Sequence, residues 1–238
     1  MRQIAFIALI FISFSAHAEY KEFSSGTGFF VSRSGHIMTN AHVIKPCGDN
    51  PIYFRGPNRQ PQVAKLTRRR DDLDLALIRS DTFHPNRIAV FRWSQDDIVA
   101  GEKVFILGYP EPKDIGVPPT AVESTVISAL GPQNEPEYLQ FHNIVRHGNS
   151  GGPLMDFAGN VIGVVTAKTT LYRRNAASGR TEKISESDVA INMNTIKRFL
   201  DSEYVMYQQT ESFGDLTARR LEQIAETYTV HVFCEVAK

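Results

Sequence analysis

The sequence predicts an all-β protein, built as a sandwich or a barrel. Past the first twenty residues, short runs of Val, Ile, Phe, Leu and Tyr alternate with Gly, Pro, Asn and Asp, which is the pattern of short strands joined by turns. Strands are expected at 28–31, 36–39, 52–54, 62–71, 75–79, 103–108, 120–129, 138–141, 153–155, 161–167 and 188–192. Many short strands with frequent turns are typical of these two architectures.

The end of the chain changes character. Residues 194–204 are expected to form a helix, and residues 214–227 show partial 3.6-residue periodicity that predicts a second one. Residues 229–236 alternate apolar and other side chains, which predicts a last strand. Residues 171–186 are polar and basic, and a surface loop without regular structure is expected there; ordering on substrate binding is the alternative.

Charge and length exclude some classes of protein. The 238 residues carry 26 basic and 26 acidic side chains, so nothing favours nucleic acid or an anionic membrane as a partner. The length suits one domain, or two small ones that share a cleft. No feature indicates an oligomeric state.

The N-terminus predicts export. Residues 4–14 are almost wholly apolar, with Arg2 before them and Ala-His-Ala at 16–18 after them. This pattern predicts a secretory signal peptide, residues 1–18, and no stable membrane insertion after its cleavage. The run is short for a membrane span, which takes about 20 apolar residues; an uncleaved anchor is the alternative.

Residues 148–152, Gly-Asn-Ser-Gly-Gly, are the most informative segment. Glycine contributes no side chain to a core, so glycines around a serine make sense where the backbone itself takes part in chemistry. Gly148 can adopt a conformation that turns its N–H toward the same point as the N–H of Ser150. Two such donors, with Asn149 between them, would form an oxyanion hole beside a nucleophilic Ser150 Oγ.

Two upstream segments strengthen this interpretation. Residues 39–43 read Thr-Asn-Ala-His-Val, and residues 71–78 read Asp-Asp-Leu-Asp-Leu-Ala-Leu-Ile. With His42 and Asp74 preceding Ser150, the chain resembles the trypsin-like (chymotrypsin-fold) serine peptidases over residues 26–200. It is most similar to their bacterial Deg-type branch, whose signatures are T-N-x-H-V, D-L-A-L and G-N-S-G-G.

The resemblance implies a fold and its boundaries. It implies two six-stranded antiparallel β-barrels at about 20–94 and 95–191 within a peptidase domain of residues 19–205, followed by a C-terminal helix and a short helix-strand extension at 206–238. The active-site cleft would lie between the barrels. The extension is too short for the PDZ domain of larger Deg-type proteases.

The resemblance also assigns roles to residues. His42 is the general base, Asp74 orients it and Ser150 is the nucleophile. Asp74 precedes four apolar residues, so its carboxylate needs a partner; the alternative, a turn residue before a strand, suits Asp71 and Asp72 better. Asn149 stands where digestive trypsins carry an aspartate that pairs with a new N-terminus, so activation by that ion pair is not expected.

The substrate pocket rests on analogy alone. The resemblance implies that Ile144, His147, Val165, Thr166 and Ala167 wall it, and that the strand at 164–167 binds substrate backbone at its edge. Ile144 stands where trypsin-type pockets carry an acid, which disfavours Arg or Lys at the cleaved position and favours small or medium apolar side chains. His147 and Lys168 leave an acidic preference as the alternative; that both simply face solvent is the simpler interpretation.

The two cysteines, Cys47 and Cys234, allow one pairing. An oxidising compartment permits a disulfide, which would close most of the domain and tie the C-terminal tail beside His42. Two free thiols are the alternative. Neither cysteine has metal-ligand spacing, so no metal is expected.

These observations predict a periplasmic or secreted serine endopeptidase that hydrolyses protein or peptide substrates through an acyl-enzyme, without a cofactor. The alternative is a binding or regulatory module of the same fold whose active site assembles rarely. An esterase on another fold is disfavoured by the His-Asp-Ser order and the absence of a Gly-x-Ser-x-Gly motif.

Overall fold

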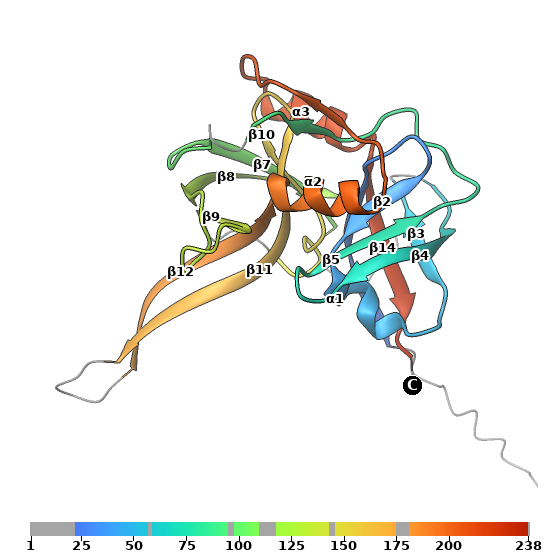
Figure 1. Cartoon of the computed structure of the whole chain (residues 1–238), viewed down its shortest axis with the longest axis horizontal. Coiled ribbons are helices and arrows are strands. Elements are labelled where there is room, and N and C mark those ends of the chain that lie inside the picture. Colours follow the sequence, from blue (N-terminus) through green and yellow to red (C-terminus); the bar gives the residue numbers. More distant parts are fainter. Residues whose placement is uncertain are drawn as a thin grey trace, which may run out of the picture.

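The structure is a computed structural model that describes residues 22–56, 59–94, 98–109, 118–142, 146–174 and 181–237. The expected signal peptide, residues 1–18, lies outside these residues. Two β-barrels stand side by side (Figure 1), and each closes with six strands, so the expected two-barrel fold is confirmed. Within the described part of the chain, no helix is long and apolar enough to span a membrane.

The first barrel closes in the order β1-β14-β3-β4-β5-β2. Its strands are β1 (Phe23–Phe30), β2 (His36–Thr39), β3 (Ile52–Arg55), β4 (Gln62–Arg70), β5 (Leu75–Arg79) and β14 (Thr229–Glu235). The interior is tightly filled: a Cβ on Gly28 would come within 2.8 Å of the Ile37 and Val232 side chains. Strand closure and apolar filling therefore depend on residues from both ends of the chain.

The last strand, β14, lies between β1 and β3 (Figure 1). Thr27 of β1 pairs with His231, and His231 also pairs with Arg55 of β3. The strand itself was expected, but residues 206–238 were expected to form an extension beyond the barrels. The topology corrects that placement, because the five strands of the N-terminal part leave β1 and β3 without their partner, and unpaired sheet edges invite aggregation.

The second barrel closes through β10-β7-β8-β9-β12-β11, with β11 pairing back onto β10. Its strands are β7 (Lys103–Gly108), β8 (Thr120–Ser128), β9 (Tyr138–His142), β10 (Pro153–Asp156), β11 (Val161–Arg174) and β12 (Thr181–Asn192). Two short strands, β6 (Val90–Arg92) and β13 (Gln208–Thr210), extend the sheet from β11 by parallel pairing. Neither strand was expected from the sequence, and β6 lies inside the range expected for the first barrel.

The helices are short. They are α1 (Ala41–Ile44), the 3₁₀ turn η1 (Lys45–Cys47), α2 (Met193–Ser202) and α3 (Ala218–Ala225). Side chains cap the two longer helices, because Asn192 accepts from the N–H of Thr195 at 3.0 Å and Thr217 accepts from the N–H of Arg220 at 3.3 Å. The structure thus confirms helices within 194–204 and 214–227.

Strands β11 and β12 continue beyond the barrel as a two-stranded ribbon (Figure 1). The register runs from Thr169 opposite Ser187 to Arg174 opposite Thr181, whereas the pairing of β12 with β9 begins at Ser187. The expected loop at 171–186 is therefore strand at both ends, and residues 175–180 lie outside the described ones. Alternation in this polar segment was too weak to indicate strands.

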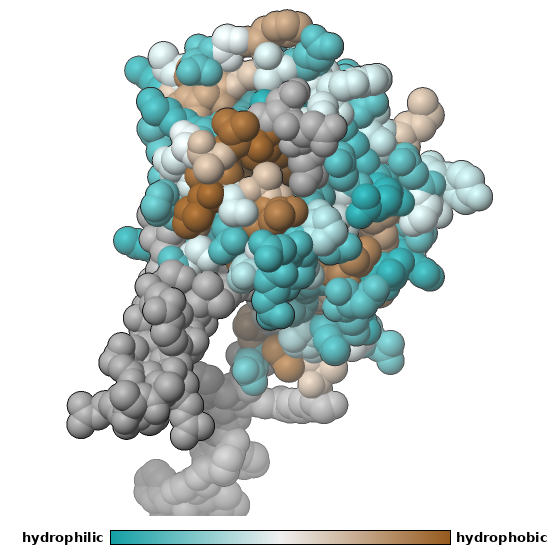
Figure 2. All heavy atoms as spheres, turned by 60° about the vertical axis from the view of Figure 1, so that its left-hand side comes forward, coloured by the Kyte–Doolittle hydropathy of each residue, from teal (hydrophilic) through white to brown (hydrophobic). Residues whose placement is uncertain are grey.

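The side of the second barrel that carries β8, β9 and β12 faces the reader in Figure 2. Hydrophilic residues cover most of the coloured surface, and a group of apolar residues interrupts them. Exposed apolar side chains of this barrel include Val99, Ile127 and Leu130. The larger part of its apolar residues fills the barrel interior, among them Phe105, Phe141 and Val165.

Candidate active site

Asp74 occupies a distorted position at the start of β5. Its φ is +52°, a left-handed conformation that costs a residue with a side chain on the order of 1 kcal/mol and that Asp tolerates better than most. Its carbonyl accepts hydrogen bonds from the N–H of Ala41 at 3.1 Å and from Asn40 Nδ2 at 2.9 Å. These bonds fix the turn before β5 to the start of α1, which carries His42.

The Asp74 carboxylate binds His42 twice. Asp74 Oδ2 lies 2.8 Å from His42 Nδ1, and Oδ1 accepts the backbone N–H of His42 at 2.9 Å. Burial alone would raise the pKa of Asp74, but the hydrogen bonds from His42 and Thr166 and the charge of His42 outweigh it, so the pKa lies below its ordinary value. With Nδ1 engaged, His42 keeps Nε2 for chemistry, and half of its side chain is exposed.

Thr166 joins this pair to Ser150. A β-bulge in β11 leaves Thr166 without a partner in β12, between the pairs Val165–Ala190 and Ala167–Val189. Bulges re-aim side chains beside active sites. Here the Thr166 hydroxyl donates to Asp74 Oδ2 at 2.5 Å, and its carbonyl accepts the Ser150 hydroxyl at 3.1 Å. Its side chain, expected in the pocket wall, thus contacts the acid instead.

The Ser150 loop is held by backbone contacts on both sides. The carbonyl of Ser150 accepts the N–H of Thr27 at 2.8 Å, and the N–H of Gly151 donates to the carbonyl of Val165 at 2.8 Å. Gly151 has φ +86°, and a Cβ there would lie 2.1 Å from the carbonyl oxygen of Thr27. Backbone crowding therefore explains why glycine follows the serine.

Gly148 and Ser150 keep free N–H groups. Within the described residues neither N–H donates a hydrogen bond, whereas the N–H of Asn149 donates to the carbonyl of Arg146 at 3.2 Å. Gly148 has φ +94°, and its carbonyl accepts the Thr27 hydroxyl at 2.6 Å. The expected donor pair is thus available, but Asn149 lies between the donors as part of a turn and adds none.

Ser150 and His42 are not joined by a hydrogen bond in this arrangement. The serine hydroxyl donates to the Thr166 carbonyl, and among the described residues no other acceptor takes its proton. Hydrogen bonds between catalytic groups are often absent or long without substrate and form in the complex. Rotation of the serine side chain away from Thr166 is therefore required before His42 can act on it.

The remaining pocket residues fall in different places. Ile144 lies outside the described residues. His147 is exposed beside Gly148, and Val165 is fully buried. Val165 pairs with β12 and also donates its N–H to the carbonyl of Gly152. Among the described residues, the edge of β11 on this side therefore lacks a strand partner only beyond Thr166, from Ala167 onward. The expected edge at 164–167 is corrected accordingly.

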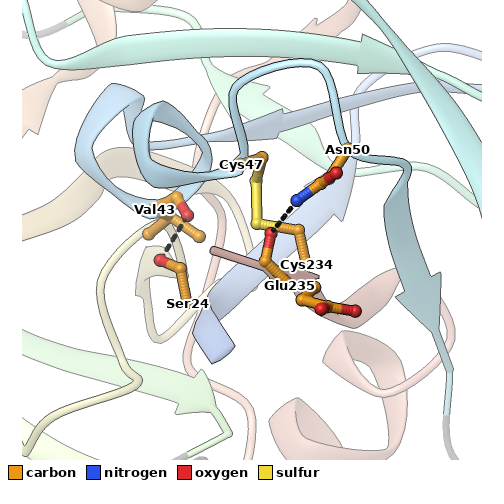
Figure 3. Close-up of a disulfide and its surroundings, with 6 residues drawn as sticks. All are labelled: Ser24, Val43, Cys47, Asn50, Cys234 and Glu235. Carbon is orange, nitrogen blue, oxygen red and sulfur yellow. Dashed lines mark hydrogen bonds between the residues drawn. A yellow bond between two sulfur atoms is a disulfide. The ribbon is translucent and has the colours of Figure 1, made fainter. Parts of the chain in front are cut away.

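The predicted disulfide is present and fixes the segment that carries His42. Cys47 of η1 and Cys234 of β14 are joined at 1.99 Å, with both side chains buried (Figure 3). Beside it, Asn50 Nδ2 donates to the carbonyl of Glu235 at 3.1 Å, and the Ser24 hydroxyl donates to the carbonyl of Val43 at 2.7 Å (Figure 3). Helix α1 is thus tied to both β14 and β1.

Two residues that contact this region were missed from the sequence. Thr27 holds Gly148 and Ser150, and also accepts the N–H of Tyr109 at 2.9 Å. His231 lies opposite Thr27, stacks on the Tyr109 ring at 5.2 Å and lies 3.2 Å from Ser25 Oγ through Nε2. The glycines that flank Thr27 were a usable signal of close backbone approach; His231 carried none.

In the described ranges, no three His, Cys, Asp or Glu side chains gather in a way that could hold a metal ion. The side chains and backbone of the candidate site present a carboxylate, an imidazole, a hydroxyl and the N–H groups of Gly148 and Ser150.

Known proteins resemble this chain over the same segments. Residues 26–164 match the family description "trypsin-like peptidase domain". An uncharacterized protein, y4bJ of Sinorhizobium fredii, is 33% identical over 218 residues, covering 89% of this chain and 32% of its own length. A "probable periplasmic serine endoprotease DegP-like" of Hahella chejuensis is 30% identical over 180 residues, covering 73% of this chain and 36% of its own.

A solved structure agrees in fold. The HtrA-type protease AlgW with a decapeptide superposes with a TM-score of 0.58 at 24% identity, covering 75% of this chain and 51% of that one. The chain spans about a third of the length of the curated relatives it matches. The resemblance to the Deg-type branch noted in the sequence is thus confirmed.

Proposed function

We propose that this chain, which belongs to the trypsin-like peptidase family, is a serine endopeptidase with His42, Asp74 and Ser150 as its catalytic residues. One observation carries the proposal. The backbone and side chain of Thr166 bond to Ser150 and Asp74, and Asp74 holds His42 through two hydrogen bonds. His42 and Asp74 are 32 positions apart in the chain, and Asp74 and Ser150 are 76 positions apart. All three thereby lie around one bulge.

The first step is acylation. Ser150 Oγ turns from the Thr166 carbonyl toward His42 Nε2, gives up its proton to that nitrogen and forms a bond to the substrate carbonyl carbon. The carbonyl π electrons move onto oxygen, and the free N–H groups of Gly148 and Ser150 stabilise this oxyanion. Asp74 stays ionised, as its lowered pKa favours, and stabilises the imidazolium.

The second half returns the enzyme to its starting state. The C–N bond breaks as His42 Nε2 gives its proton to the leaving amine, and an ester to Ser150 remains. Water then attacks this ester with His42 as the base, through a second oxyanion at the same two N–H groups. Collapse releases the new carboxyl group and returns the proton to Ser150 Oγ.

We infer that substrate backbone adds to β11 beyond the bulge. Within the part of the chain that the structure describes, β11 pairs from Ala167 onward with β12 on one side and with no strand on the other. A free edge binds extended peptides through main-chain hydrogen bonds. An extended substrate placed there would continue past Thr166 toward Ser150. The projecting ribbon prolongs the same edge, so it would offer a longer path for extended substrates than a short loop would.

We also infer an exported protein, periplasmic or secreted. The apolar segment at 4–14 is typical of a signal peptide, and the buried Cys47–Cys234 disulfide suits an oxidising compartment.

The direct test uses protein that begins at Glu19, with a Ser150→Ala variant as control. Both are incubated with casein and with a mixture-based peptide library, and cleavage sites are read by mass spectrometry. The proposal predicts cleavage that the variant lacks, with small or medium apolar residues before the cut. Folded protein that cleaves neither substrate, or a variant that cleaves equally well, would contradict it.

A second function is favoured by one observation: the hydroxyl of Ser150 donates to Thr166 and not to His42. A regulatory or binding module that assembles its active site only with a partner would show this arrangement. It predicts slow cleavage of single peptides and a rise of tenfold or more when an activating peptide is added in excess, about 1.4 kcal/mol. A cleavage rate that does not change when the activating peptide is added supports a constitutively active enzyme.

A further inference from the structure

A cavity opens at the end of the first barrel, between the barrel and α3. Its volume is about 430 Å³, and it lies within the size range of small-molecule sites in proteins. Aromatic rings form its apolar part: Phe83 packs on Phe30 at 5.3 Å and on Phe54 at 6.2 Å between ring centroids. None of the residues that surround Ser150 and His42 line it.

Three arginines, Arg55, Arg59 and Arg87, line the same cavity. None of them has a carboxylate within ion-pair distance in the described part of the chain, although arginines on β4 and β5, such as Arg70 and Arg79, pair with aspartates at 2.6 and 2.8 Å. Guanidinium groups that line one cavity without an ion-pair partner among the described residues favour an anionic guest.

Polar atoms in the cavity wall lack partners. Arg55 Nε and Thr229 Oγ1 are buried without a hydrogen bond, and an unmet buried polar group costs about 1–3 kcal/mol. The Arg59 guanidinium lies over the Phe83 ring, 4.9 Å from its centroid. The cavity thus offers a cationic group directly beside an aromatic surface. Glu226, the single acid among its described lining residues, excludes a guest of high negative charge.

We propose that this cavity binds a monocarboxylate with an aromatic or branched apolar body. The carboxylate lies among the guanidinium groups, and the apolar body lies against Phe83. Two sources share this chemistry, a free aromatic acid and the C-terminal residue of a peptide. The site is independent of the peptidase reaction and would remain if Ser150 were inert.

Binding of the acid in the cavity would affect the rest of the molecule through β14. Thr229 and Val230, at the start of β14, line the cavity, and the same strand ends at Cys234 beside the segment that carries His42. Helix α3 contributes Gln223 to the wall. A bound carboxylate would therefore hold α3 against the barrel wall at the start of β14 and raise the temperature of unfolding.

Isothermal titration calorimetry on the Ser150→Ala protein tests the proposal. The probes are N-acetyl-L-phenylalanine and its neutral amide, and the peptide Ala-Ala-Ala-Phe with a free or an amidated C-terminus. The acid should bind with a Kd below about 1 mM and at least tenfold more tightly than the amide, a difference of about 1.4 kcal/mol. Binding of the free acid alone indicates a small molecule, and binding of the free-ended peptide as well indicates a peptide terminus; either supports the site.

Matched variants locate the binding. The double variant Arg59→Gln/Arg87→Gln should bind the acid at least tenfold more weakly. The double variant Arg219→Gln/Arg220→Gln on α3, outside the cavity lining, should change the Kd for the acid less than twofold. Thermal unfolding checks that all variants fold. Equal affinity for acid and amide, no saturable heat, or an unchanged Kd in the Arg59/Arg87 pair would overturn the proposal.

Discussion

The two barrels contribute to the site in different ways. The first barrel holds a hydrogen-bonded pair already in place: His42 and Asp74 share two hydrogen bonds, and the Cys47–Cys234 disulfide fixes the segment that carries the histidine. The second barrel contributes Ser150 from a glycine-rich loop, and the serine hydroxyl bonds within its own barrel, to Thr166. The proposed acid and base are therefore prearranged, whereas the proposed nucleophile has to turn.

The two barrels also differ in how their strands close. The first barrel needs the last strand of the chain to close, so its stability depends on both ends of the sequence. The second barrel closes within one continuous stretch and prolongs two of its strands into a ribbon. Changes to the first barrel should therefore affect folding, and changes to the ribbon should affect the cleavage of substrates.

Removal of residues 228–238 should have the largest effect. It deletes β14, its disulfide and its buried side chains, and leaves β1 and β3 as open edges. We expect no folded, soluble product, measured by gel filtration and circular dichroism. Replacement of 171–185 by an Asn-Gly turn is the matched change in the second barrel and should give folded protein. Equal folding of both variants would show that β14 is dispensable.

Asp74→Asn should lower kcat by about 10³–10⁴-fold with little change in stability. The amide cannot stabilise the imidazolium and favours the wrong tautomer of His42. Asp72→Asn is the control, because Asp72 is exposed and pairs with Arg70; its kcat should stay within about twofold. Peptide hydrolysis and urea unfolding measure the two quantities, and an Asp74→Asn enzyme with more than a tenth of the activity would refute this role.

Thr27→Val should lower kcat by about 10–100-fold with KM nearly unchanged. The change leaves the Gly148 carbonyl without its donor and the N–H of Tyr109 without its acceptor, at the interface between the barrels. Thr27→Ser keeps the hydroxyl and should restore kcat to within about threefold. Comparable losses in both variants would mean that packing, and not the hydroxyl, matters here.

The smallest expected effect concerns acid stability. Burial, with a smaller contribution from Arg55, lowers the pKa of His231 to about 4. The unfolded chain, with a histidine pKa near 6.5, takes up the proton first as pH falls. The contribution of His231 to stability is therefore complete above about pH 6.5 and is lost toward pH 4, by up to about 3 kcal/mol.

Urea unfolding at pH 7.5 and pH 4.5 measures this loss in the Ser150→Ala background. With His231→Gln added, the decrease between the two pH values should shrink by about 2 kcal/mol. A decrease of the same size in both proteins would show that other groups govern acid stability.

The sequence was sufficient for the barrels and for the three candidate catalytic residues. Apolar runs and turn residues marked nearly every strand, and His42, Asp74 and Ser150 carried local patterns of their own. It was insufficient for the place of β14, because strand alternation reports a half-buried surface and not the neighbouring strand. The short parallel strands β6 and β13 carry too few residues for a period to appear.

Within the candidate site, the sequence again failed to show which strands lie beside each other. Thr166 was expected in the pocket wall, yet a bulge turns it toward Asp74, and a bulge depends on register between strands. Thr27 lies more than a hundred residues before the loop that it holds. Local patterns pointed to the candidate catalytic residues, and only the pairing of distant strands revealed what positions them.

Labelling with a fluorophosphonate tests the central claim most directly, since this probe phosphonylates a serine that its active site has made nucleophilic, and a histidine variant shows which base activates it. Mass spectrometry of the labelled, folded protein should find the adduct on Ser150 alone, and His42→Ala should abolish it while leaving the protein folded. Folded protein that stays unlabelled, or a label that His42→Ala does not remove, would contradict the account.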